Sequence, residues 1–190
     1  MKALGLRLSS RPDMEEHVKW MEKSVRTRLW MIRNLKKAGF TIEELLQVYK
    51  TVIRPVAEYG AVVFHSGLTD DQDERLDRLQ NAAMKCIFGP FKSARKMRRM
   101  AGILSLRERR IQLCDKFAKK ALGNPRFSHW FPQKTGRRTS LRAGKQNEVF
   151  LEEKARCKRL YDSPIFYFRR RLNGKEGKNY GKRNEEYRTK

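Results

Sequence analysis

The chain has 190 residues, of which 45 are Lys or Arg and 21 are Asp or Glu, so its formal net charge is +24. Its 39% hydrophobic and 35% charged residues can form one modest core, which argues against disorder of the whole chain. Apolar runs are too short to cross a bilayer and the N-terminus lacks a signal-peptide core, so we expect an intracellular protein, nuclear or cytoplasmic, without a membrane partner. The charge favours a polyanionic partner, most often nucleic acid; a merely solvated basic surface is the alternative.

The first long helix is predicted to begin at a capping box formed by Asp13 and Glu16 and to end at Gly39. Before it, residues 3–8 alternate weakly and predict a strand stub that has no partner. Apolar residues at helical spacing form one face of the helix: Met14, Val18, Met21, Val25, Leu29, Ile32 and Leu35. A basic ridge lies on the opposite face: Lys19, Lys23, Arg26, Arg33, Lys36 and Lys37.

A second capping box, Thr41 with Glu44, opens the next predicted helix. Its apolar residues recur at spacings of three and four and predict one buried face: Leu45, Tyr49, Val52, Val56 and Tyr59. Pro55 lies inside this stretch and removes a backbone donor, so we expect a kinked helix. Arg54 can bind nucleic acid, or it can pair with Glu58 four residues later.

Two further capping boxes predict helices in residues 69–125. Thr69 with Gln72 opens a helix that stops at Gly89, a glycine suited to a left-handed cap, and Ser105 with Glu108 opens another that runs to Gly123. A short helix ending near Gly102 is expected between them. It carries a dense basic group: Arg95, Lys96, Arg98 and Arg99.

Periodicity fades after residue 125, and the charge becomes denser. Residues 126–172 predict a basic extension with short helices, including one that starts at Ser163 and Pro164. Residues 173–190 have the composition of a disordered tail. The predicted fold is therefore mainly α, a multi-helix bundle over 13–125 with an N-terminal strand stub over 1–12 and a basic, partly disordered C-terminal region.

No catalytic or metal constellation is evident in the sequence. The adjacent aspartates Asp70 and Asp71 lie at a helix N-terminus, where carboxylates complement the helix dipole, so we interpret them as caps. Cys86, Cys114 and Cys157 fit neither a disulfide framework nor a zinc spacing. We expect His17 to be structural.

Two segments of the sequence are Tyr49-Lys-Thr-Val-Ile-Arg-Pro-Val-Ala-Glu-Tyr59 and Arg75-Leu-Asp-Arg-Leu-Gln80. Together they resemble the thumb region of reverse transcriptases from non-LTR (LINE-type) retrotransposons. In that family a Tyr-x-x-x-Ile-Arg-Pro-x-x-Glu-Tyr helix precedes an Arg-Leu-x-x-Leu-Gln helix. Other short matches look like the end of the palm and the closing segment of the family: Leu4-Gly5, His17-Val18, Ser163-Pro164 and Leu172-Asn173. The resemblance thus implies the end of the palm, the thumb and the region beyond.

The resemblance implies a thumb that binds RNA, DNA or an RNA–DNA hybrid for an RNA-directed DNA polymerase. The family's catalytic aspartates, including its Ala-Asp-Asp turn, are absent from this sequence. We therefore expect no enzyme activity from the chain alone and no cofactor in it, with Mg²⁺ held only by a separate palm and fingers segment. Thumbs grip a duplex by its backbone, which requires cations at helical spacing.

Nine cations are the predicted nucleic-acid-binding residues: Lys19, Lys23, Arg26, Arg33, Lys37, Arg95, Lys96, Arg98 and Arg99. Trp20, Trp30 and Tyr49 can stack on bases or belong to the core. Two rival interpretations stay open at this point. One is a stand-alone basic RNA-binding structural or assembly protein, and the other is a decayed fragment without a selected function.

Overall fold

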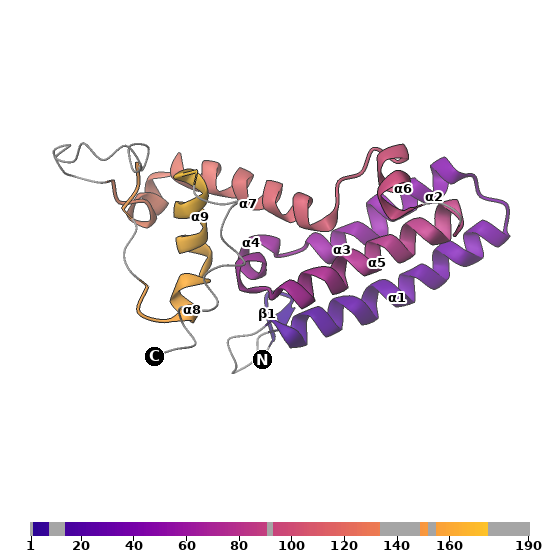
Figure 1. Cartoon of the computed structure of the whole chain (residues 1–190), viewed down its shortest axis with the longest axis horizontal. Helices are drawn as coiled ribbons and strands as arrows, with labels where there is room; N and C mark the ends of the chain where they lie inside the picture. Colours follow the sequence, from indigo (N-terminus) through magenta and orange to yellow (C-terminus); the bar gives the residue numbers. More distant parts are fainter. Residues whose placement is uncertain (1, 8–13, 91–92, 134–148, 152–154, 175–190) are drawn as a thin grey trace. The chain divides into compact units, whose positions relative to one another are not determined.

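The computed structural model describes residues 2–7, 14–90, 93–133, 149–151 and 155–174, and in them the chain is mainly helical, as predicted (Figure 1). The predicted tail lies outside the described residues from 175 onward. The chain forms two compact units, Met1–Leu113 and Cys114–Lys190, and the division falls inside helix α7 (Leu106–Leu122). Each unit is described by itself below.

The first unit begins with a two-stranded antiparallel hairpin, β1 (Lys2–Ala3) and β2 (Leu6–Arg7). The expectation of a strand without a partner was therefore wrong, because the chain turns back on itself at Leu4 and Gly5. Gly5 has a φ of +84°, a conformation that glycine adopts without strain. The phenolic ring of Tyr59 lies against Gly5, and its hydroxyl donates a hydrogen bond to the carbonyl of Leu4 at 2.7 Å.

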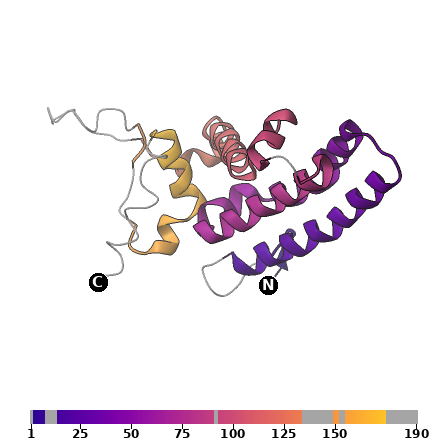
Figure 2. The same ribbon diagram turned by 45° about the vertical axis from the view of Figure 1, so that its right-hand side comes forward.

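Helix α1 (Glu15–Lys37) confirms the predicted apolar face, with Val18, Met21, Val25, Leu29 and Ile32 buried. Its N-cap is Met14, which makes no side-chain cap hydrogen bond, and Asp13 of the predicted capping box lies outside the described residues. Helices α1 and α5 (Asp70–Phe88) run side by side and pack together (Figures 1 and 2).

The next predicted helix is interrupted by a π-helical turn. It consists of α2 (Ile42–Val48), the π turn η1 (Tyr49–Ile53) and α3 (Arg54–Glu58). The capping box of Thr41 and Glu44 is confirmed. The predicted buried face is wrong at Val52 and Tyr59, whereas Val56 is half-buried and packs against the core. Exposed fractions are 39% for Val52 and 55% for Tyr59, whereas Ile53 and Ala57 are buried. A π turn holds more residues than an α turn, so each later side chain shifts by about one position around the axis.

Short helices complete the first unit around α5. They are α4 (Ala61–Phe64), the 3-10 turn η2 (His65–Gly67) and α6 (Ala94–Met100). The capping boxes at Thr69 with Gln72 and at Ser105 with Glu108 are both present. Gly89 ends α5 with φ +89° but an extended ψ of 169°, so it is not the left-handed helical cap that was predicted.

The second unit contains the 3-10 helix η3 (Pro125–Trp130), α8 (Lys158–Tyr161) and α9 (Pro164–Leu172). Its buried residues come from α7, α9 with the following Asn173, Phe131 and an extended segment at 149–151. The side chain of Asn173 holds that segment: its Oδ1 accepts hydrogen bonds from the amides of Val149 and Phe150, and its Nδ2 donates to the carbonyl of Phe150, each at 3.0 Å. Pro164 occupies the first turn of α9, as predicted.

Candidate nucleic-acid interface

One exposed row of cations runs along α1. It consists of Lys19, Lys23, Arg26, Arg33 and Lys37, which we call the α1 row. Each member lies three, four or seven residues from the next, so all five project from one side of the helix. The row spans 18 residues from first to last, or about 27 Å at 1.5 Å per residue. The opposite side of α1 is buried in the core, which fixes the row toward solvent.

The α1 row retains most of its charge. Lys19 makes a single ion pair, with Glu15 at 3.6 Å, and 59% of its side chain is exposed. Within the part of the chain that the structure describes, the other four members form no ion pair or hydrogen bond through their side chains. Their charges are thus available to an external anion.

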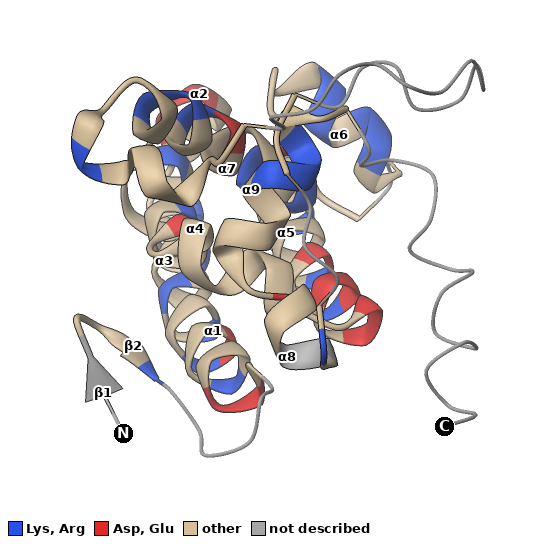
Figure 3. Ribbon diagram, turned by 90° about the vertical axis from the view of Figure 1, so that its left-hand side faces the viewer, with Lys and Arg blue, Asp and Glu red and all other residues tan. Residues whose placement is uncertain are grey.

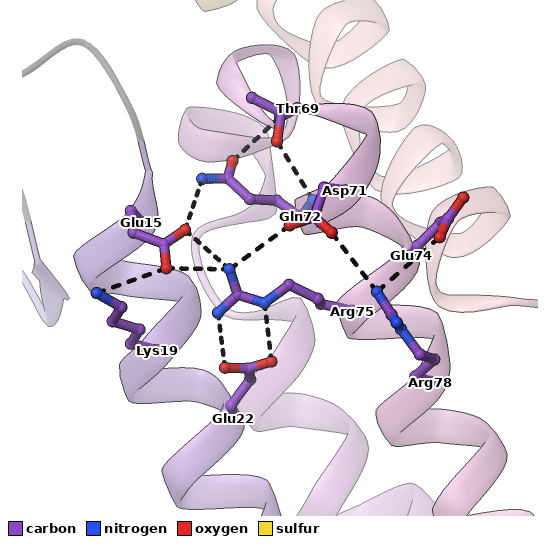
Figure 4. Close-up of polar contacts among 9 residues, drawn as sticks. All are labelled: Glu15, Lys19, Glu22, Thr69, Asp71, Gln72, Glu74, Arg75 and Arg78. Atoms are coloured by element: carbon purple, nitrogen blue, oxygen red, sulfur yellow. Dashed lines mark hydrogen bonds and ion pairs between the residues drawn. The ribbon is translucent and has the colours of Figure 1, made fainter.

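Two carboxylates next to the row are engaged by an arginine of α5 (Figure 4). Arg75 donates to both oxygens of Glu15, at 3.0 and 2.9 Å, and to both oxygens of Glu22, at 3.1 and 2.8 Å. Hydrogen bonds from Arg75 lower the pKa values of Glu15 and Glu22, and these bonds raise the pKa of Arg75. Arg75 thereby joins α1 to α5 through two carboxylates that lie next to the row.

The second predicted group, on α6, is only partly available. Arg95, Lys96 and Arg99 are exposed. Arg98 is half-buried and donates to the Oδ1 of Asn81 at 2.6 Å, so its side chain anchors α6 to α5. Asn81 lies six residues beyond Arg75, or roughly 120° around α5. The two helices that carry the basic groups are therefore anchored at positions roughly 120° apart around α5.

The motif residues that carry the family resemblance lie mainly inside the first unit. Tyr49 is 1% exposed, and burial raises the pKa of its hydroxyl to about 12. Arg54 pairs with Glu58, which also lies 3.4 Å from Arg109 of α7. This outcome supports the structural role of Arg54. Gln80 donates to the carbonyl of Leu104 at 2.9 Å and accepts from the amide of Leu106 at 3.0 Å, which bridges α5 to the start of α7.

A buried ion pair that the sequence did not reveal lies beside this network. Arg110 is 0% exposed and pairs with Asp73, whose other oxygen lies 3.2 Å from Arg107. Burial raises the pKa of the neighbouring Asp77. The basic cluster at 107–110 is therefore partly buried in the first unit. Neither hydrophobic periodicity nor a capping signal in the sequence distinguishes a buried arginine from an exposed one.

The arginines of α9 are likewise used within the second unit, although they read as a basic run in the sequence (Figure 3). Arg169 donates to the carbonyl of Trp130 at 2.6 Å, and Arg170 donates to the carbonyl of Tyr161 at 2.8 Å. Arg171 pairs with Asp115 of α7. These three residues consequently bind other parts of their own unit.

The three aromatic candidates for stacking differ in exposure. Tyr49 is core. Trp20 is half-buried, and its ring lies 5.6 Å from that of His17, which is itself buried as expected. Trp30 is 66% exposed and lies within the α1 row.

Among the described residues, no group of His, Cys, Asp or Glu could hold a metal ion, and no helix is long and apolar enough to span a membrane. Cys86, Cys114 and Cys157 are not joined in disulfides. In comparisons with known proteins, no family model, curated protein sequence or solved structure matches the chain.

Proposed function

We propose that this chain is the nucleic-acid-binding thumb part of a retrotransposon reverse transcriptase, and that it contributes binding rather than catalysis to an RNA-directed DNA polymerase. The α1 row is the observation that carries this proposal. Five cations on one exposed side of a helix, four of them without a hydrogen bond or ion pair among the described residues, suit a phosphate backbone. The family part of the proposal rests on the motif resemblance alone.

The geometry of the row supports a backbone contact. Phosphates of one duplex strand follow each other every 3.4 Å or so along the axis, so a row about 27 Å long can face several of them. Five contacts would make the affinity fall roughly 500-fold between about 50 and 200 mM salt, because each neutralised phosphate releases counterions. Binding should show little sequence preference.

A charge-matched pair of variants tests this role. The double substitution Lys23→Gln and Arg26→Gln removes two charges from the row, and the double substitution Lys50→Gln and Lys85→Gln removes two exposed charges elsewhere in the first unit. Duplex and hybrid affinities are measured by fluorescence anisotropy over a salt series. The row variant should reduce the logarithmic salt slope by about 1.8, while the control leaves it nearly unchanged.

Two results would count against the proposal. One is wild-type binding that does not respond to salt. The other is an equal loss in the row variant and the control, which would indicate a diffuse attraction set by net charge instead of a contact through α1.

A further inference from the structure

Trp30 interrupts the α1 row at its centre. It follows Arg26 by four residues and precedes Arg33 by three, so its indole projects from the same side of α1 as these two guanidinium groups. The neighbouring arginines lie about 6 Å and 4.5 Å away along the helix axis. An aromatic ring thus lies between two exposed cations.

The indole has no role in the packing of the first unit. Trp30 is 66% exposed, and within the described residues its ring makes no aromatic or cation–π contact. Trp20 on the same helix shows the contrast, since it packs on His17 and lies under the guanidinium of Arg7 at 6.0 Å. Tryptophan is large and apolar, and the exposed indole of Trp30 offers a flat face on which a ligand can stack.

The chemistry around the ring identifies that ligand. Arg26 and Arg33 attract phosphates, and the flat face of an indole stacks on nucleobases without regard to sequence. Bases inside a duplex are already stacked on each other, so within a strand the ring can stack only on an unpaired base. We propose that Trp30 stacks on a base of single-stranded nucleic acid whose adjacent phosphates are held by Arg26 and Arg33. This inference rests on the proposed function and adds a single-strand site to it.

Two substitutions of Trp30 separate ring stacking from general hydrophobicity. Trp30→Phe keeps an aromatic face, and Trp30→Leu keeps apolar bulk without one. The probes are a single-stranded oligonucleotide of about ten nucleotides, within the usual site sizes, and a blunt duplex of the same length. Trp30→Leu should weaken single-strand binding roughly five- to a hundredfold, Trp30→Phe should lose less, and duplex binding should stay the same in both.

Indole fluorescence provides a direct second measurement. The single strand should quench the wild-type emission, and most of that quenching should disappear in Trp30→Phe, although Trp20 and Trp130 remain. Because the indole is exposed, both variants should keep the wild-type circular dichroism spectrum, which verifies that they fold.

The inference is overturned if Trp30→Leu binds the single strand as tightly as wild type, or if quenching survives in Trp30→Phe. If these results come with salt-dependent duplex binding, only the stacking site fails and the proposed function stands. A wild-type protein that binds neither probe overturns both.

Discussion

The π turn at Tyr49–Ile53 predicts that two neighbouring apolar residues contribute very differently to stability. Ile53 is 2% exposed, whereas Val52 is 39% exposed. A regular α-helix with the apolar periodicity of the sequence would bury Val52 instead. The substitutions Ile53→Ala and Val52→Ala therefore measure the register of the helix directly.

The magnitudes follow from burial. Ile53→Ala removes three buried carbons, about 2.4 kcal/mol at 0.8 kcal/mol per group, and leaves a cavity that brings the total loss to about 3–4 kcal/mol. Val52→Ala removes two partly exposed carbons, which costs about 1 kcal/mol at most, and the better helix propensity of alanine offsets part of that.

Urea unfolding followed by circular dichroism measures both variants, and an unchanged m-value verifies that the comparison concerns stability. We expect the midpoint of Ile53→Ala to fall by several times the shift of Val52→Ala. Equal losses, or a larger loss for Val52→Ala, would refute the π-turn register and favour a regular helix.

Two further predictions concern titratable groups of the first unit. Burial lowers the pKa of His17, so as pH falls below 6.5 the unfolded chain binds a proton on this side chain more readily than the folded chain does. Thermal scans should therefore show that stability decreases as pH falls below 6.5, and His17→Gln should remove this decrease. If His17→Gln keeps the wild-type pH dependence, the assignment is wrong. Arg75→Met should cost about 1 kcal/mol near neutral pH, because it removes the bidentate partner that Glu15 and Glu22 share. This cost should shrink as pH falls below 4.5, since the stabilisation is fully present above that pH and is lost as pH falls through the lowered pKa values of the two carboxyls; a cost that stays constant with pH would contradict this origin.

Local signals predicted much of the fold. Three capping boxes are present where the sequence places them, at Thr41, Thr69 and Ser105, because a cap depends on residues only three positions apart. The apolar face of α1 is confirmed for the same reason, since a regular 3.6-residue period needs no knowledge of the partner helix.

The sequence did not predict the features that depend on contacts between residues far apart in the chain. The register change at Tyr49 arises from a π turn, for which Pro55 gave only a general expectation of a kink. Arg110 pairs with a carboxylate 37 residues earlier, and Arg75 bridges residues more than 50 positions away. In the sequence an inward arginine and an outward one look alike, so periodicity predicted the exposure of the α1 row but not the half-burial of Arg98 or the burial of Arg110.

The residues of the resemblance motif differ from the residues of the α1 row, so variants of the two groups should be interpreted differently. Tyr49, Arg54 and Gln80 of the resemblance motif bind or pack within the first unit, whereas none of the α1 row belongs to that motif. Loss of binding after a change at Gln80 would therefore follow from a displaced α7, and it should be accompanied by loss of stability. Loss of binding after a change at Lys23 or Arg26 should leave stability intact, because these side chains contact no other described residue through a hydrogen bond or ion pair. Measuring affinity and stability on the same variants thus distinguishes the residues that hold the bundle together from those that face the nucleic acid.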